Sequence, residues 1–394
     1  MECRYRYVKL PGEEKRLFCV EQNPLILAWV LFFKENTLAP ATMQISSKKW
    51  SVQWLKDLVR KYISFSRINL WKLKVFIEYK YRKRSIAAWV ELPFYGQICV
   101  LVNKGYKIFD LHRRVAIKVY RADVDISTIE TELNHLKHSS LFTFGPLLGR
   151  MNITERWYEE SYVSGSLTYW PGLRNSLDWL RKFYGDTIPC LMHLILHQPP
   201  LKINTVDYLN DMGSSMKTPN LRKQVSDGGQ LKKILSFIYS IDIRIRSRGN
   251  IPVFLVLTHG DFCTGNMLNT KHGLRVLDWE SATQRSALFD FYSYFFHRPV
   301  DQNIPIKQLS EEISIALPNV ISRLDLTSPD ISASLKSFVE VYRWLYYYER
   351  IHMLIGRMKY DTKHNIMVYI LRCIEVFSEY EELSGESYRY SRRT

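Results

Sequence analysis

The stretch Thr258–Glu280 reads THGDFCTGNMLNTKHGLRVLDWE, and most of the fold prediction depends on it. It follows Ile251–Leu257, a short apolar run rich in β-branched residues, which predicts a buried strand. Asp261 and Asn266 come directly after this strand and are five positions apart. A compact loop on a rigid base can therefore aim a carboxylate and an amide oxygen in chosen directions.

A hairpin is predicted immediately after this loop. Met267 and Leu268 continue as a strand, 271–273 is a turn, and the returning strand ends at Asp278. We expect this hairpin to bring Asp278 close to Asn266. Magnesium prefers hard oxygen ligands and usually takes one or two of them from protein. Asn266 and Asp278 are therefore the candidate magnesium ligands.

The motif HGDxxxxN, the short hairpin and then LDWE resemble the aminoglycoside phosphotransferase and choline kinase superfamily, which has a protein-kinase-like fold. The resemblance implies transfer of the γ-phosphoryl group of ATP to a hydroxyl, with Mg²⁺ as cofactor. The residues to which it gives roles are Asp261 as catalytic base, Asn266 and Asp278 as metal ligands, Asp290 as brace of the catalytic loop, and His259 as structural support.

Upstream of this region, alternating apolar residues predict three antiparallel strands, at Ile98–Asn103, Tyr106–Leu111 and Val115–Tyr120. A helix should follow, starting near Asp125 or Ser127. The resemblance matches the superfamily's phosphate-binding lysine to Lys118, in VAIKVY.

The helix carboxylate that would pair with Lys118 is either Glu130 or Glu132, and we favour Glu132. The loop before the second strand has one glycine, Gly105, where many kinases have a GxGxxG set. By analogy with relatives, Glu160 and Tyr162 lie in the segment that joins the lobes and offers backbone groups to the nucleobase.

These patterns predict an α+β protein with a bilobal, protein-kinase-like fold and an N-terminal extension. The predicted domains are a basic and aromatic extension (1–95), a small nucleotide-binding lobe (96–163) and a helical catalytic lobe (164–394). Helices are expected at 176–184, 188–197, 231–248, 330–358 and 363–383, with a loop at 204–229.

The charge of the chain indicates an anionic partner. The 394 residues carry a formal net charge of +16, and part of the excess lies between Lys48 and Arg84. This region is read either as a solvated face or as a patch that contacts an anionic membrane surface, while nucleic acid is not expected. The six cysteines show no metal spacing and there is no transmembrane run, so we expect a cytoplasmic protein, peripheral at the inner membrane if the patch is real.

Three functions follow from the resemblance. Cationic drugs are usually held by acidic pockets, so the positive charge favours a small-molecule acceptor that is a sugar or glycan precursor, in bacterial envelope polysaccharide or lipopolysaccharide biosynthesis. The alternatives are an aminoglycoside- or choline-type kinase and a catalytically silent, nucleotide-binding scaffold. The presence of Lys118, Asp261, Asn266 and Asp278 favours an active enzyme.

Overall fold

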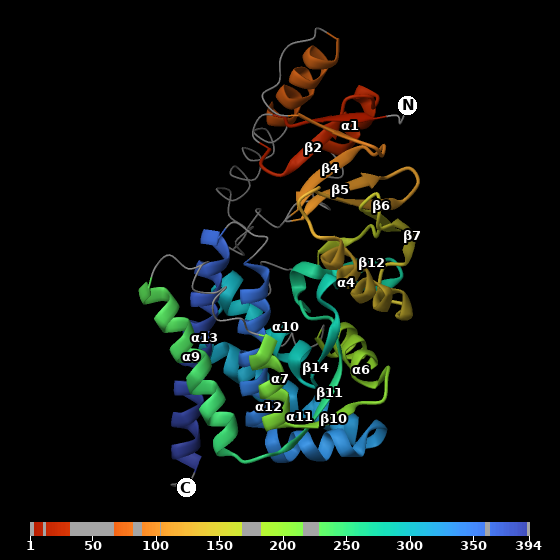
Figure 1. The fold of residues 1–394 in the computed structure, drawn as a ribbon. Helices are drawn as coiled ribbons and strands as arrows, with labels where there is room; N and C mark the ends of the chain where they lie inside the picture. Colours follow the sequence, from red (N-terminus) through yellow and green to blue (C-terminus); the bar gives the residue numbers. More distant parts are fainter. Residues whose placement is uncertain are drawn as a thin grey trace, which may run out of the picture. The chain divides into compact units, whose positions relative to one another are not determined.

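Figure 1 shows the computed structural model of the chain, which describes residues 4–10, 13–31, 67–81, 89–102, 104–167, 183–215, 228–358 and 363–391. The chain divides into two compact units. The sheet unit comprises Met1–Arg174 and Met267–Glu280, and the helical unit comprises Asn175–Asn266 and Ser281–Thr394. The basic residues Arg82, Lys83 and Arg84 of the predicted membrane patch lie outside the described residues.

The sheet unit is built on an eight-stranded antiparallel sheet with the order β3-β1-β2-β4-β5-β6-β8-β7. Its strands are β1 (Tyr5–Val8), β2 (Arg16–Cys19), β3 (Trp89–Leu92), β4 (Ile98–Val102), β5 (Gly105–Asp110), β6 (Val115–Tyr120), β7 (Leu148–Asn152) and β8 (Trp157–Ser161). The three predicted central strands are thereby confirmed, and β6 has the predicted bounds.

Both faces of this sheet are covered by apolar side chains. Successive residues of a strand point to opposite faces, so Tyr7 and Val8 of β1 enter two different core clusters. Val8 packs with Leu27 of α1 (Pro24–Trp29) and with Phe76, in a helical stretch at 67–81. The sheet thus has a core on each side.

The first strands of the chain belong to the same sheet as the predicted nucleotide-binding lobe. β2 pairs with β4 through Arg16↔Val100 and Leu17↔Cys99. The predicted domain boundary at residue 95 therefore falls inside a continuous sheet, because backbone hydrogen bonding between β2 and β4 crosses it.

Helix α4 (Ile126–Lys137) follows β6 as predicted, with Asp125 at its N-cap position. Ile129, Glu132, Leu133 and Leu136 recur at helical spacing and are buried. The sheet unit also contains β9 (Ser166–Leu167), β12 (Met267–Thr270) and β13 (Gly273–Val276), which form a small antiparallel sheet with β12 in the centre. The predicted hairpin after the catalytic loop is confirmed as β12 and β13.

The helical unit surrounds a long helix, α12 (Pro329–Arg357), which packs against α9, α10, α11 and α13. Its other helices are α6 (Ile188–Leu196), α7 (Thr205–Ser215), α9 (Gly228–Ser247), α10 (Phe289–Gln302), α11 (Ile306–Thr327) and α13 (Lys363–Ser391). A three-stranded sheet in the order β10 (Leu201–Asn204), β11 (Pro252–Thr258) and β14 (Thr283–Ser286) lies among them.

The predicted α+β class is confirmed, as are the helices that correspond to α6, α9, α12 and α13. The prediction of a loop throughout 204–229 was wrong, because α7 begins at Thr205. Of the helix expected at 176–184, only its last two residues are described, and they belong to a π-turn. Within the described part of the chain, none of the helices is both long and apolar enough to cross a membrane.

Candidate active site

Lys118 lies in β6 at the centre of a buried ion-pair cluster in the sheet unit. Its side chain is 2% exposed, and its ammonium group donates to Glu132 of α4 and to Glu280. Lys104, in the turn before β5, donates to the other oxygen of Glu132 at 2.7 Å. The predicted pairing of Lys118 with Glu132 is therefore present, while Glu130 is exposed to solvent.

Glu280 reaches this cluster because the residue before it is firmly anchored. The indole of Trp279 is fully buried, stacks on Phe142 at 5.3 Å between ring centroids, and donates to the backbone oxygen of Val276 at 2.8 Å. The backbone oxygen of Glu280 lies 2.9 Å from Nδ1 of His135 on α4. The DWE segment thus holds its carboxylate against Lys118.

The burial of two carboxylates beside one another changes their titration. Burial and the Glu280 charge raise the pKa of Glu132 to about 7, although Lys118 and Lys104 oppose the shift. Burial also acts on Glu280, but Lys118 holds the pKa of this carboxyl well below its usual range. The pair therefore takes up a proton as the pH falls through about 7.

A polar pocket of about 270 Å³ opens beside this cluster. Its walls are formed by Lys104, Ser127, Thr128, Thr131, Glu132, His135 and Glu280. Gly105 follows Lys104 and pairs with Tyr120 of β6, and a Cβ atom at Gly105 would collide with the backbone oxygen of Val119. The single glycine of the predicted phosphate loop therefore has a packing reason to be glycine.

The backbone of the segment predicted to face a nucleobase is largely used within the protein. The N–H of Tyr162 donates to the oxygen of Arg114 at 2.8 Å, and Glu160 pairs with Ala116 in the sheet. The Glu160 side chain binds Lys107 of β5 at 2.5 Å. The Tyr162 N–H already has an acceptor within the protein, and the contact of this segment with a nucleobase stays a prediction.

The loop that carries Asp261 is held by Asp290, to which the resemblance gave a bracing role. Asp290, in the first turn of α10, accepts hydrogen bonds from the backbone N–H groups of His259 at 2.5 Å and Gly260 at 3.0 Å. Gly260 has a φ of +85°, a conformation that strongly favours glycine. His259 is fully buried, and its Nδ1 accepts from the N–H of Asp261 at 3.2 Å.

Asp261 itself is surrounded by cationic and amide groups. Arg350 on α12 donates to Oδ1 at 3.0 Å, and Arg357, two turns further along the same helix, lies 3.8 Å from Oδ2. Asn266 donates from its amide nitrogen to the backbone oxygen of Asp261 at 2.9 Å and to Oδ2 at 3.3 Å. Burial opposes ionisation, yet Arg350, Arg357 and His297 hold the pKa of Asp261 well below its usual range.

The chemistry of the two candidate metal ligands fits magnesium. Asn266 uses its amide nitrogen toward Asp261, so its carbonyl oxygen is the atom left for a metal. Asp278 is exposed at the end of the hairpin and has a φ of +65°. Both supply hard oxygen atoms, as Mg²⁺ requires. Asn266 belongs to the helical unit and Asp278 to the sheet unit, and their joint binding of one ion stays a prediction.

Sequence reasoning assigned no role to several residues that the structure brings to these sites. Glu280 is the last residue of the LDWE motif, but nothing in the motif indicated a bond to Lys118, which lies 162 positions earlier. Arg350 and Arg357 lie on α12, for which the sequence predicted only a helix at 330–358. The sequence showed the net positive charge of the chain, but it did not show that these two arginines lie beside Asp261.

The comparison with protein families bears on this part of the chain. Residues 245–311 match the model of the phosphotransferase enzyme family. This segment contains β11, the loop with Asp261 and Asn266, the hairpin and Asp290. The match confirms the resemblance predicted from the sequence motifs. No curated protein matches the sequence significantly.

Several solved structures resemble the chain at low identity. A choline kinase from Streptococcus pneumoniae is 13% identical, with a TM-score of 0.46 over 71% of this chain and 91% of that one. An ethanolamine kinase from Plasmodium vivax is 12% identical, with a TM-score of 0.43 over 84% and 95% of the two chains. A microcompartment-associated aminopropanol kinase is 15% identical, with a TM-score of 0.44 over 72% and 91%. Identities this low transfer no substrate to this chain.

Proposed function

We propose that this protein is an ATP-dependent phosphotransferase that acts on a hydroxyl group of a small molecule. The observation that carries the proposal is the loop of Asp261, which is braced by Asp290 and lies within the segment that matches the phosphotransferase family. Asp261 would orient the acceptor hydroxyl and accept its proton. Lys118 would hold the nucleotide phosphates once Glu280 has released it.

The low pKa of Asp261 suits orientation better than strong base catalysis. A carboxylate held by Arg350 and Arg357 stays ionised and accepts a hydrogen bond. Because its pKa is low, it is a weak base and does not remove the hydroxyl proton early in the reaction. In the loose transition state of phosphoryl transfer the nucleophile needs little activation, and catalysis depends mainly on positioning and on charge stabilisation. When bound by Asn266 and Asp278, Mg²⁺ would neutralise phosphate charge.

The surroundings of Asp261 support an acceptor that is neutral or anionic. A polycationic acceptor would meet two guanidinium groups within 4 Å of the carboxylate that must receive its hydroxyl. Together with the net charge of +16, this favours a sugar or glycan precursor over an aminoglycoside or choline. A role in bacterial envelope polysaccharide or lipopolysaccharide biosynthesis is the setting we propose for such an acceptor.

The test is an acceptor screen with ATP and Mg²⁺. We expect ADP release with neutral sugars, sugar acids or sugar phosphates, and a product that gains one phosphate group by mass spectrometry. Choline, ethanolamine and aminoglycosides form the opposing arm. If only these compounds are phosphorylated, the proposed acceptor class is wrong, but the proposed phosphotransferase reaction is supported.

The catalytic role is tested with Asp261→Asn, using the best acceptor from the screen. We expect the turnover rate to fall by roughly 10²–10⁴-fold, because the variant can neither accept the proton nor hold the hydroxyl in the same way. ADP affinity should stay within about twofold. Asp325→Asn, an exposed carboxylate paired with Lys336 in the same unit, is the matched control.

Two outcomes would reject the proposal. An Asp261→Asn variant that turns over as fast as the native protein would remove Asp261 from the reaction. ATP binding without phosphorylation of any acceptor, together with no cellular effect of Asp261→Asn, would indicate the nucleotide-binding scaffold instead.

A further inference from the structure

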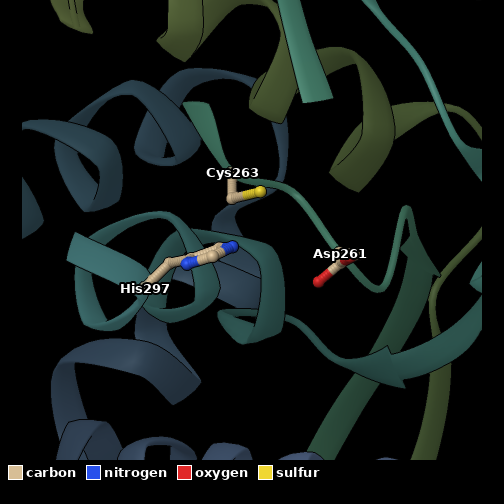
Figure 2. A group of neighbouring side chains, drawn as sticks. All are labelled: Asp261, Cys263 and His297. Carbon is tan, nitrogen blue, oxygen red and sulfur yellow. The ribbon is translucent and has the colours of Figure 1, made fainter. Parts of the chain in front are cut away.

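A second group of side chains in the helical unit converges on Asp261 from a different direction. Figure 2 shows Asp261, Cys263 and His297 directed toward a common space. One ligand atom from each of the three lies within 4.8 Å of the others. Cys263 is buried, whereas the side chains of Asp261 and His297 are 16% and 20% exposed.

His297 is held in a defined orientation by a neighbour on its own helix. Its Nδ1 bonds to the carboxylate of Asp301, one turn further along α10. This contact leaves Nε2 as the imidazole atom for another partner. A carboxylate on the far nitrogen of a histidine is the usual support of a metal-binding imidazole, because it fixes the ring and the tautomer and raises ligand basicity.

The donor set selects a particular kind of metal. Magnesium and calcium take oxygen atoms, whereas a thiolate, an imidazole and a carboxylate together suit Zn²⁺ and related divalent ions. We propose that Asp261, Cys263 and His297 bind Zn²⁺ or a similar divalent transition metal, with water as the fourth ligand. This site is separate in chemistry from the predicted magnesium ligands, Asn266 and Asp278.

Positive charge near the site opposes the metal and shapes how it would bind. Oδ1 of Asp261 is held by Arg350, so the metal would take Oδ2, where Arg357 and Asn266 make the longer contacts. Arg357 is 38% exposed and can move into solvent. Burial raises the pKa of the Cys263 thiol, so binding has to displace its proton.

Binding at this site would take Asp261 away from an acceptor hydroxyl. If the proposed phosphotransferase activity holds, Zn²⁺ would therefore inhibit it while ATP binding persists. That consequence rests on the proposed function, but metal binding does not. The experiment below reads metal binding directly, so failure of the site and failure of the activity are distinguishable.

The experiment uses Co²⁺ as a spectroscopic substitute for Zn²⁺ in the full-length protein. We expect visible bands of the intensity given by tetrahedral cobalt and a near-ultraviolet thiolate-to-cobalt band, both lost when Zn²⁺ is added. Cys263→Ser should abolish the thiolate band, and His297→Gln should weaken Zn²⁺ binding at least about a hundredfold by calorimetry. Cys190→Ser, a buried cysteine of α6 outside the cluster, should leave the spectrum unchanged.

Two further variants test the geometry. Asp301→Asn should weaken Zn²⁺ binding by about 10–100-fold, because it removes the support of the imidazole. Arg357→Gln should strengthen Zn²⁺ binding by roughly fivefold, because it removes a positive charge that repels the metal. A native protein without a thiolate-to-cobalt band, or a band that survives in Cys263→Ser, would overturn the proposal even if one variant failed to fold.

Discussion

The two charged sites of this protein have opposite arrangements. In the sheet unit a buried cation, Lys118, lies between the carboxylates of Glu132 and Glu280. In the helical unit a carboxylate, Asp261, lies between the guanidinium groups of Arg350 and Arg357. In both sites the central ion has partners of opposite charge, which lower the cost of burying it.

The difference between them lies in which group can titrate near neutral pH. Two carboxylates compete for Lys118, so burial and repulsion raise the pKa of Glu132 to about 7. Asp261 has two cationic partners that cannot lose their protons at neutral pH, and its pKa is held well below the usual range. We therefore expect the Lys118 cluster to respond to pH between 5 and 7, and the Asp261 cluster to stay ionised there.

Removing the central cation should produce the largest effect on stability. Lys118→Met would leave two buried carboxyl groups without their shared partner, and we expect the free energy of unfolding to fall by about 3–5 kcal/mol. Guanidinium unfolding followed by circular dichroism measures this change. Lys137→Met, at the exposed end of α4, is the matched control and should change stability little.

A triple variant separates the loss of the Lys118 ion pairs from the loss of its other contacts. If Lys118→Met destabilises because it strands two carboxylates, then adding Glu132→Gln and Glu280→Gln should restore at least half of the loss. No restoration would mean that the loss comes from other contacts of Lys118, such as its cation–π contact with the ring of Tyr120 at 4.9 Å.

Removing one cation from the opposite site should have a smaller effect. Arg350 is buried and also donates to the backbone oxygen of Gly260 at 3.3 Å, so Arg350→Met should cost about 2–3 kcal/mol. Asp261 would keep its contacts with Asn266 and Arg357. Arg357→Met should cost less than about 1 kcal/mol, because that side chain is half-exposed and its contact is longer.

The pH dependence of the Arg350→Met effect has a definite sign. Asp261 has a pKa below its usual value of 3.8, so its contribution to stability is present above that pH and is lost as the pH falls below it. The difference between the native protein and Arg350→Met should therefore narrow as the pH falls from 5 to 2. A difference that stays constant would show that Arg350 does not lower the pKa of Asp261.

Much of the fold could be predicted from local patterns. Alternation at 98–120 gave the three central strands, and the turn at 271–273 gave the hairpin, because both depend on neighbours in the sequence. The pairing of β2 with β4 could not be predicted in this way, since Leu17 and its partner Cys99 are 82 positions apart and no turn connects the two strands directly. Helix α7 was missed because its sequence, TVDYLNDMGSS, is polar and contains residues typical of loops.

The candidate site divides along the same line. Asp261, Asn266 and Asp290 lie within one short segment whose spacing carries the prediction. The arginines that lower the pKa of Asp261 come from α12. Arg350, for example, lies 89 positions after Asp261 in the sequence. A separation of this length in the sequence does not predict a contact, because the contact depends on how the helices pack.

A further prediction tests the titration of the Lys118 cluster. Glu132 has a pKa of about 7 in the folded protein against a usual 4.5, so the folded state binds more protons between these values. Its contribution to stability therefore falls as the pH rises from about 4.5 to 7. Glu132→Gln lacks this change, and its unfolding free energy should gain about 1–3 kcal/mol relative to the native protein between pH 5 and pH 8.

The comparison between variant and native protein isolates Glu132 from other groups that titrate in this range. Burial raises the pKa of Asp290 to about 6 and lowers that of His352 to about 4, but both groups are present in both proteins. Glu130→Gln, on the exposed face of the same helix, should show no such gain. If the Glu132→Gln difference is the same at pH 5 and pH 8, then Glu132 is ionised throughout, and the two charged sites do not differ in their response to pH.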